Sequence, residues 1–312
     1  MSEQNTFLQA ERLVQRITLA TIVLCMALIM IKGIAVDVPA YGSAVGTGLL
    51  LITVGMIYRR SGRDQRIGST AICAGWFILF TLSLSLFNYL LMPHWAPTID
   101  VYLAEIDLLL FGYHWPDFVR ANAANPIVYE AMRYAYLSTL PQIACLLIAL
   151  GLSGRTREMY GLTTTVTLAG TMTIVIWGVV PSLGPSALYE LPAMAGHAPP
   201  VVEAAYGREI ARLFAEGATI LSPDEIRGLI AFPSFHIVLA MAAVVYSRRV
   251  AWLFPLFLAV NLLVLPGVLV HGGHHVIDIP AGMLVFAVAM RLSRQSVPQV
   301  AASPSQLVLR SR

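Results

Sequence analysis

The sequence has few charged residues. Of 312 residues, 12% are Asp, Glu, Lys or Arg, whereas 57% are hydrophobic and the mean hydropathy is +0.73. A soluble globular domain contains about one-quarter charged residues. The low charge content excludes an ordinary soluble domain and predicts an integral membrane protein.

Lysine and cysteine are also scarce. Lys32 is the single lysine beside 19 arginines, and against 17 acidic residues the net charge is only +3. So small an excess gives no reason to expect a nucleic-acid partner. The three cysteines, Cys25, Cys73 and Cys145, lie in apolar segments and lack metal-ligand spacing. We therefore expect neither a disulfide framework nor a metal site.

The sequence is instead rich in long apolar runs. A helix that crosses the bilayer needs about 20 apolar residues, and the first run is too long for the core of a cleaved signal peptide. We predict an all-α fold, a polytopic membrane helical bundle of about eight transmembrane helices. The runs lie near residues 17–36, 43–58, 69–91, 134–152, 161–181, 233–247, 251–270 and 276–292.

Arginines follow every second run, which predicts the orientation. Cytoplasmic loops carry an excess of basic residues, so both termini are expected in the cytoplasm. The two long connections, 92–133 and 182–230, then lie outside and contain amphipathic or aromatic stretches typical of lids at the membrane surface. The basic loops contain Arg59, Arg60, Arg63, Arg66, Arg155, Arg157, Arg248, Arg249, Arg291 and Arg294.

Two polar motifs stand at the outer ends of apolar runs. His274 and Asp278 are four residues apart, so on a helix their side chains can meet, and the carboxylate can fix the imidazole tautomer. The second motif is Phe232-Pro233-Ser234-Phe235-His236. Ionisable groups at a membrane position are costly and usually functional. We predict that the two motifs form one site.

The order of these motifs resembles a known family. Pro233-Ser234-Phe235-His236, then His274-x-x-x-Asp278 and Pro280-Ala281-Gly282, resembles the type 2 phosphatidic acid phosphatase (PAP2) superfamily, whose members have a six-helix core. The likeness covers roughly the C-terminal two-thirds of the chain. It implies three regions: two additional N-terminal transmembrane helices in 1–67, the catalytic core in 68–294, and a disordered cytoplasmic tail in 295–312.

The resemblance implies a phosphohistidine mechanism that needs no cofactor. His274 would attack phosphorus, Asp278 would orient it, and His236 would protonate the leaving oxygen. Ser234 and nearby backbone N–H groups would hold phosphoryl oxygens, although Ser234 could instead cap the following helix. The roles of three further residues stay open at this stage: His275 could be the nucleophile instead, His271 could be a substrate contact or an interfacial residue, and Gly273 could bring the backbone close to the substrate or merely make a turn.

The sequence departs from the phosphatase pattern at its cations. The K-x6-R-P motif is absent, and residues 264–270, where an arginine would precede the nucleophile, are uncharged. A phosphodiester carries one negative charge and needs less neutralisation than a phosphomonoester. The departure resembles the sphingolipid-synthase branch, typified by inositol phosphorylceramide synthase. Outer arginines that could supply charge instead are Arg133, Arg208, Arg212 and Arg227.

Three functions are compatible with these observations. The first is a lipid phosphotransferase that moves a phosphoryl-head group from a phospholipid donor to a lipid hydroxyl acceptor. The second is a lipid phosphatase acting on phosphatidic acid or a polyprenyl diphosphate with the same residues. The third is a transporter or lipid-binding membrane protein, which would need more polar residues near the bilayer midplane. The residue bias hints at a bacterial inner-membrane protein whose site faces the periplasm.

Overall fold

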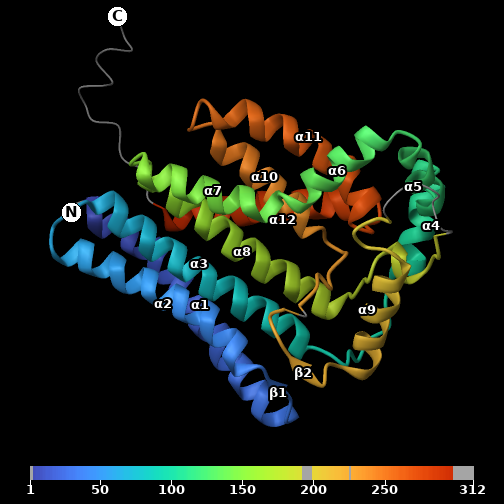
Figure 1. The fold of residues 1–312 in the computed structure, drawn as a ribbon, viewed down its shortest axis with the longest axis horizontal. Helices are drawn as coiled ribbons and strands as arrows, with labels where there is room; N and C mark the ends of the chain where they lie inside the picture. Colours follow the sequence, from blue (N-terminus) through green and yellow to red (C-terminus); the bar gives the residue numbers. More distant parts are fainter. Residues whose placement is uncertain (1–2, 192–198, 225, 298–312) are drawn as a thin grey trace, which may run out of the picture.

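The structure is a computed structural model that describes residues 3–191, 199–224 and 226–297. Within these residues it is built almost entirely of helices, which confirms the predicted all-α class (Figure 1). Most of the expected tail, 298–312, lies outside the described residues. The helices are α1 (Glu3–Lys32), α2 (Val38–Arg60), α3 (Gln65–Leu90), α4 (Asp100–Phe111), α5 (Trp115–Ala123), α6 (Pro126–Leu137), α7 (Thr139–Leu152), α8 (Thr156–Val179), the 3-10 turn η1 (Pro185–Ala187), α9 (Ala204–Glu216), α10 (Phe235–Ser247), α11 (Leu253–His271) and α12 (Asp278–Ser296).

Every apolar run of the sequence forms a helix, but fewer than eight helices qualify as full spans. In the described part of the chain, α1, α2, α3, α8 and α11 are long and apolar enough to cross a membrane. The pair α6 and α7 qualifies as one span bent by 53°. α10 has only 13 residues, and α12 ends in the charged turn that holds Arg294. The bundle is confirmed as polytopic, with five such helices or six with the bent pair.

Glycines allow α2 and α3 to pack closely. A Cβ on Gly75 would lie 2.5 Å from the carbonyl oxygen of Gly48, and one on Gly55 would lie 2.7 Å from that of Gly68. Such approaches are possible only without a side chain. α2 and α3 therefore form a tight antiparallel hairpin.

The central core joins α7, α8, α10 and α12. Leu146, Leu162, Val238 and Phe286 come from these four helices, are buried and belong to one apolar cluster. α10 runs through the middle of this cluster, so its first residue has little freedom to move. This rigid packing holds the motif residues at the start of α10.

Shorter segments cover the end of the bundle where the two motifs lie. α4, α5 and α9 stand across that end rather than along the bundle (Figure 1). A short parallel sheet of β1 (Ala35–Val36) and β2 (Ile220–Leu221) pairs Ala35 with Ile220. The connection between α1 and α2 is thereby hydrogen-bonded to the 182–230 connection, one of the two expected lids.

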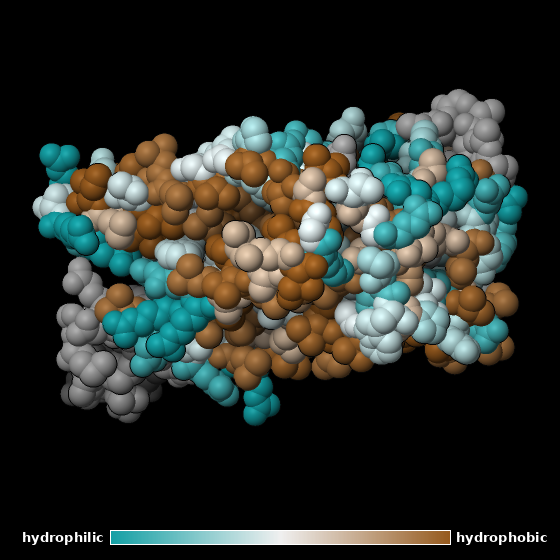
Figure 2. Space-filling view, turned by 90° about the horizontal axis from the view of Figure 1, so that it is seen from below, coloured by the Kyte–Doolittle hydropathy of each residue, from teal (hydrophilic) through white to brown (hydrophobic). Residues whose placement is uncertain are grey.

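The surface agrees with a membrane location. Figure 2 shows a broad hydrophobic band with hydrophilic residues gathered at the two ends of the molecule. Large apolar side chains are exposed on several helices, among them Leu109, Val175 and Leu262. In water such exposure would favour aggregation, whereas lipid tails cover it in a bilayer. The chain is an integral membrane protein.

Candidate functional site

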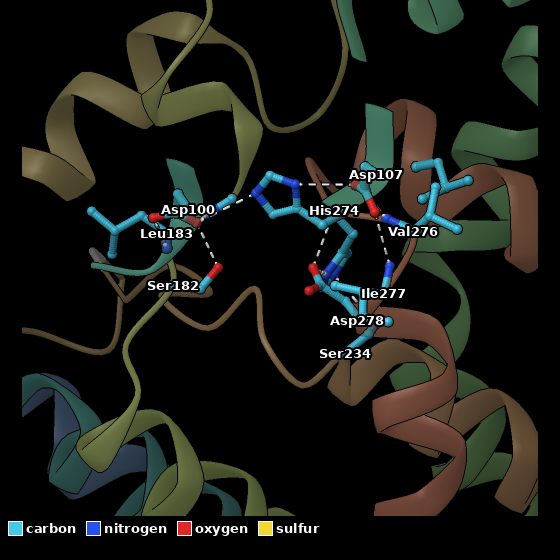
Figure 3. Close-up of polar contacts among 12 residues, drawn as sticks. Asp100, Asp107, Ser182, Leu183, Ser234, His274, Val276, Ile277 and Asp278 are labelled. Atoms are coloured by element: carbon cyan, nitrogen blue, oxygen red, sulfur yellow. Dashed lines mark hydrogen bonds and ion pairs between the residues drawn. The ribbon is translucent and has the colours of Figure 1, made fainter. Parts of the chain in front are cut away.

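The two motifs meet at the start of α10 and α12. Asp278 is the first residue of α12, and its Oδ2 lies 3.1 Å from Nδ1 of His274. The backbone N–H of Ser234 donates to the carbonyl oxygen of Asp278 at 3.2 Å, which joins the motifs directly. Figure 3 shows Ser234, His274 and Asp278 grouped together. The structure thus brings the two motifs together.

His274 is held as a single tautomer. A carboxylate only accepts hydrogen bonds, so the contact with Asp278 places the proton on Nδ1 and leaves the lone pair on Nε2. Ser234 Oγ lies 3.3 Å from that Nε2. Ser234 occupies the N-cap position of α10, but its side chain makes no capping hydrogen bond. The hydroxyl is therefore directed to the imidazole rather than to the helix.

His236 lies beside His274, on the first turn of α10. The ring centroids of the two histidines are 5.9 Å apart, and the rings are nearly perpendicular. The other face of His236 stacks on Tyr136 of α6, with centroids 4.2 Å apart. The stacking contact with Tyr136 fixes the plane of the His236 ring.

A small cavity opens onto these two imidazoles. It has a volume of about 30 Å³, little more than one water molecule, and reaches His236, His274 and Gly272. Its remaining lining comes mainly from the 182–230 connection. These residues are Leu183, Val202, Tyr206, Ile210, Gly228, Leu229, Ile230 and Ala231, together with Tyr136. Within the described residues, the lining contains no arginine or lysine.

His275 has a different environment from its neighbour His274. Its Nδ1 lies 3.2 Å from Oδ2 of Asp107, and its Nε2 lies 3.5 Å from Oδ1 of Asp100. Both aspartates are buried and come from α4, seven residues apart on one face, and Figure 3 shows them on opposite sides of the loop before Asp278. Because each ring nitrogen faces a carboxylate, both carry protons and His275 has no lone pair for nucleophilic attack.

Charge explains the titration of this cluster. Burial acts to lower the pKa of His275, but hydrogen bonds with Asp100 and Asp107 outweigh it and raise that pKa to about 9. Burial acts to raise the pKa of Asp100, yet hydrogen bonds from His275, Ser182 and two backbone N–H groups hold it below its usual range. At neutral pH this favours a protonated His275 beside an ionised Asp100.

The aspartates of α4 also fix the two loops around the site. Asp107 accepts hydrogen bonds from the backbone N–H groups of Val276 at 2.8 Å and Ile277 at 3.3 Å. Asp100 accepts from Ser182 Oγ at 2.6 Å and from the backbone of Leu183 and Gly184 at 3.0 and 2.8 Å. One helix therefore positions both the His274 loop and the 182–184 stretch that covers it.

Gly273 and His271 lie near the site in different roles. Gly273 has a positive φ of 57°, and its carbonyl oxygen would lie 2.0 Å from a Cβ on Gly184, so the two backbones touch. His271 is fully buried, and its Nε2 donates to the carbonyl oxygen of Tyr129 at 2.9 Å. Gly273 therefore forms part of the backbone wall next to His274. His271 instead hydrogen-bonds to α6 through Tyr129.

Arg133 and Arg227, two of the four outer arginines and the two predicted to bind substrate, have other partners. Arg133 donates to the carbonyl oxygen of Pro199 at 2.8 Å. Arg227 forms an ion pair with Glu209 at 3.2 Å and lies over the ring of Tyr206, 5.5 Å from its centroid. Neither side chain lines the cavity at His274. The structure does not bring either arginine to the histidines.

Sequence reasoning missed three contributors. Asp100 and Asp107 are not among the site residues predicted from the sequence, yet both are buried beside the site. Two acids seven residues apart on an otherwise apolar helix share a face, and that pattern was the available signal. Ser186 is also buried beside Gly273, and its Oγ has no hydrogen-bond partner among the described residues. No local pattern indicated Ser186.

Fold and site together define a class: a polytopic helical membrane protein with a buried carboxylate–histidine pair and a second histidine beside it. A family model described as the PAP2 superfamily matches residues 102–292, more than half of the chain. The chain therefore belongs to the PAP2 superfamily. Members are phosphatases or phosphotransferases, so the protein is an enzyme of this kind. Comparison with curated proteins and with solved structures gave no match.

Proposed function

We propose that the protein is a lipid phosphotransferase, which moves a phosphoryl-head group from a phospholipid donor to a lipid hydroxyl acceptor. The observation that carries the proposal is the apolar, cation-poor cavity over His236 and His274. A phosphodiester has one negative charge, so it needs fewer cations than a phosphomonoester dianion. An apolar cover also disfavours water as the acceptor, whereas a lipid hydroxyl is compatible with it.

The first half of the reaction forms a covalent bond to His274. Nε2 attacks the donor phosphorus, the bond between phosphorus and the donor's lipid oxygen breaks, and His236, protonated when the anionic phosphodiester lies beside it, gives its proton to that oxygen. Asp278 holds Nδ1–H and stabilises the imidazolium that forms. Ser234 Oγ, now 3.3 Å from Nε2, and the unpartnered Ser186 Oγ are placed to donate to phosphoryl oxygens.

The second half reverses these roles. An acceptor hydroxyl attacks phosphorus, His236 takes its proton, and the bond between phosphorus and Nε2 breaks. Proton donor and acceptor are thus the same imidazole in the two halves. The site lies at the end of the bundle opposite the arginine-rich loops, which supports an outer location. In a bacterial inner membrane this is the periplasmic face.

Substrates tested with purified protein distinguish transfer from hydrolysis. Fluorescent phospholipids of several head groups are incubated with and without diacylglycerol, ceramide or polyprenol, and every product is resolved by chromatography. We expect a new phospholipid that forms only with an acceptor. His114→Ala, at an exposed histidine that pairs with Asp117, is the matched control and should retain full turnover.

Two results would contradict the proposal. Release of inorganic phosphate from phosphatidic acid or a polyprenyl diphosphate, with no acceptor needed, would make the enzyme a phosphatase. Acceptor-dependent transfer that survives His274→Asn would remove the covalent mechanism.

A further inference from the structure

A second pocket lies at the opposite end of the bundle from the histidines. It has a volume of about 580 Å³ and is formed by the start of α8, the end of α10 and the end of α12. Asp278 and Arg294 stand at the two ends of α12, so the pocket is roughly 24 Å from the site along that helix, at 1.5 Å per residue. Nothing in the proposed transfer reaction uses this pocket.

Arginines dominate its wall. Arg157, Arg248, Arg249 and Arg294 line it, and Glu158 is the one acidic lining residue in the part of the chain that the structure describes. Glu158 pairs with Arg249 at 3.6 Å. Four guanidinium groups therefore surround one carboxylate, and three positive charges are left in excess.

The contacts that Arg248 and Arg294 make do not neutralise their positive charges. Arg248 lies over the ring of Phe254, with Cζ 5.8 Å from the centroid, and Arg294 Nη2 contacts the sulfur of Met290 at 3.6 Å. Aromatic and thioether contacts orient a guanidinium but leave its N–H donors and its charge available for an anion.

The pocket also has hydroxyl groups in its wall. Ser293 Oγ donates to the carbonyl oxygen of Gly161 at 3.2 Å, and Tyr246 OH contacts Thr165 Oγ1 at 2.8 Å. Ser293 is buried and Tyr246 half-buried. These hydroxyls already have protein partners, so the arginines are the groups in the wall that match a phosphate.

We infer that this pocket binds the phosphate-bearing head group of an anionic lipid in the cytoplasmic leaflet. Basic pockets between transmembrane helices on the cytoplasmic side bind anionic head groups, and a volume of this size accommodates a small ligand. Such a lipid would contact α8, α10 and α12 together and hold their cytoplasmic ends. The site is separate from the donor and acceptor site at His274.

Binding to the purified, full-length protein in a neutral detergent tests the inference. The probes are phosphatidylglycerol, phosphatidylcholine with the same acyl chains, and soluble glycerol 1-phosphate, each followed by native mass spectrometry and by the shift in melting temperature. We expect retention of phosphatidylglycerol and a rise in melting temperature, with phosphatidylcholine at least tenfold weaker. Glycerol 1-phosphate bound as tightly as the lipid would identify a soluble phosphate ester as the source of the same group.

Charge variants separate the pocket from general attraction to a basic surface. Arg157→Gln/Arg248→Gln/Arg294→Gln leaves the Glu158–Arg249 pair in place and should weaken phosphatidylglycerol binding at least tenfold. Arg16→Gln/Arg60→Gln/Arg63→Gln removes three exposed cytoplasmic arginines outside the pocket and should change binding less than twofold. If the pocket variant does not fold, Arg157→Gln and Arg294→Gln alone should each weaken binding severalfold.

Equal weakening in both triple variants, or equal affinity for phosphatidylglycerol and phosphatidylcholine, would overturn the inference. No retention of any of the three probes would overturn it as well. Because binding is measured without turnover, these outcomes are independent of the transferase proposal.

Discussion

His274 and His275 are neighbours in the chain but have opposite chemistry. His274 faces one carboxylate and a serine hydroxyl, so Nε2 keeps a lone pair. His275 faces a carboxylate at each ring nitrogen and is held as a cation. Of the two candidates for the nucleophile, the geometry supports His274, and it gives His275 the role of holding the loop.

Asp278→Asn tests the orientation of His274. An amide can present its NH2 group to Nδ1 and favour the wrong tautomer, so we expect turnover to fall roughly 10²- to 10⁴-fold with little change in substrate KM. Steady-state kinetics on the transferred head group measures both. A variant with wild-type turnover would remove Asp278 from the mechanism.

Asp107→Asn tests the buried charge cluster through pH. The folded-state pKa of His275 is about 9, above its ordinary value of about 6.5. Its contribution to stability is therefore fully present below about pH 6.5 and is lost as the pH rises through 9. We expect the wild-type melting temperature to fall between pH 6.5 and 9, and this fall to be much smaller in Asp107→Asn. At pH 7 the variant should also be less stable than the wild type, by about 3 kcal/mol.

Asp117→Asn is the control for that experiment. Asp117 is an exposed acid that also pairs with a histidine, His114, and its removal should leave the wild-type pH profile unchanged. Parallel profiles for wild type and Asp107→Asn would show that His275 is not stabilised as a cation by this aspartate.

At the scale of elements, α4 connects two loops that are far apart in the sequence. Asp107 holds 275–277, and Asp100 holds 182–184. Gly184 and Gly273 meet where these loops touch. The wall above His274 therefore depends on two helical turns of an interfacial helix and on two residues without side chains.

Gly184→Ala should break this contact. The new Cβ would lie 2.0 Å from the carbonyl oxygen of Gly273, and Gly184 also has a positive φ of 85°. We expect activity to fall at least tenfold, since a shift of about 1 Å at a reacting group has large effects on rate. Gly62 also has a positive φ, of 66°, but a Cβ there meets no atom within 4 Å, so Gly62→Ala is the control. It should lose only about 1 kcal/mol of stability and keep its activity. Similar activity losses in the two variants would contradict the role of the contact.

Elements also set the limit of prediction from sequence. His274 and Asp278 are four residues apart, so their contact could be predicted from local spacing, although the structure makes it from the loop before α12 and not within a helical turn. The contact of Asp107 with Val276 joins residues 169 positions apart, and no local pattern specifies it. The bend between α6 and α7 likewise followed from packing, and it placed Tyr136 against His236.

For the whole molecule, charge distribution predicts the orientation in the membrane. The histidine site lies at the start of α10 and α12 and the arginines at their other ends, and a hydrophobic band separates the two hydrophilic ends of the molecule (Figure 2). The alternation of basic loops was enough to predict this. It did not predict that Arg133 and Arg227 would be engaged elsewhere, because an arginine's partners depend on tertiary contacts.

Cysteine labelling tests this orientation. In a background with the three native cysteines replaced by alanine, Trp95→Cys lies in an exposed position of the 92–133 connection and Arg63→Cys in a basic loop. A membrane-impermeant maleimide applied to intact cells should label Trp95→Cys and not Arg63→Cys, and both should react after lysis. Labelling of Arg63→Cys in intact cells would reverse the assigned side of the active site.

The covalent intermediate is the most direct test of the central claim. In His236→Ala the second half of the reaction should be slow, so a fluorescent phosphodiester donor with a good leaving group should label the enzyme. Mass spectrometry of the quenched protein at neutral or alkaline pH locates the adduct. The account predicts one phosphoryl-head group on His274, with none on His275 and none in His236→Ala/His274→Asn. An adduct on another residue, or full turnover by His274→Asn, would contradict it.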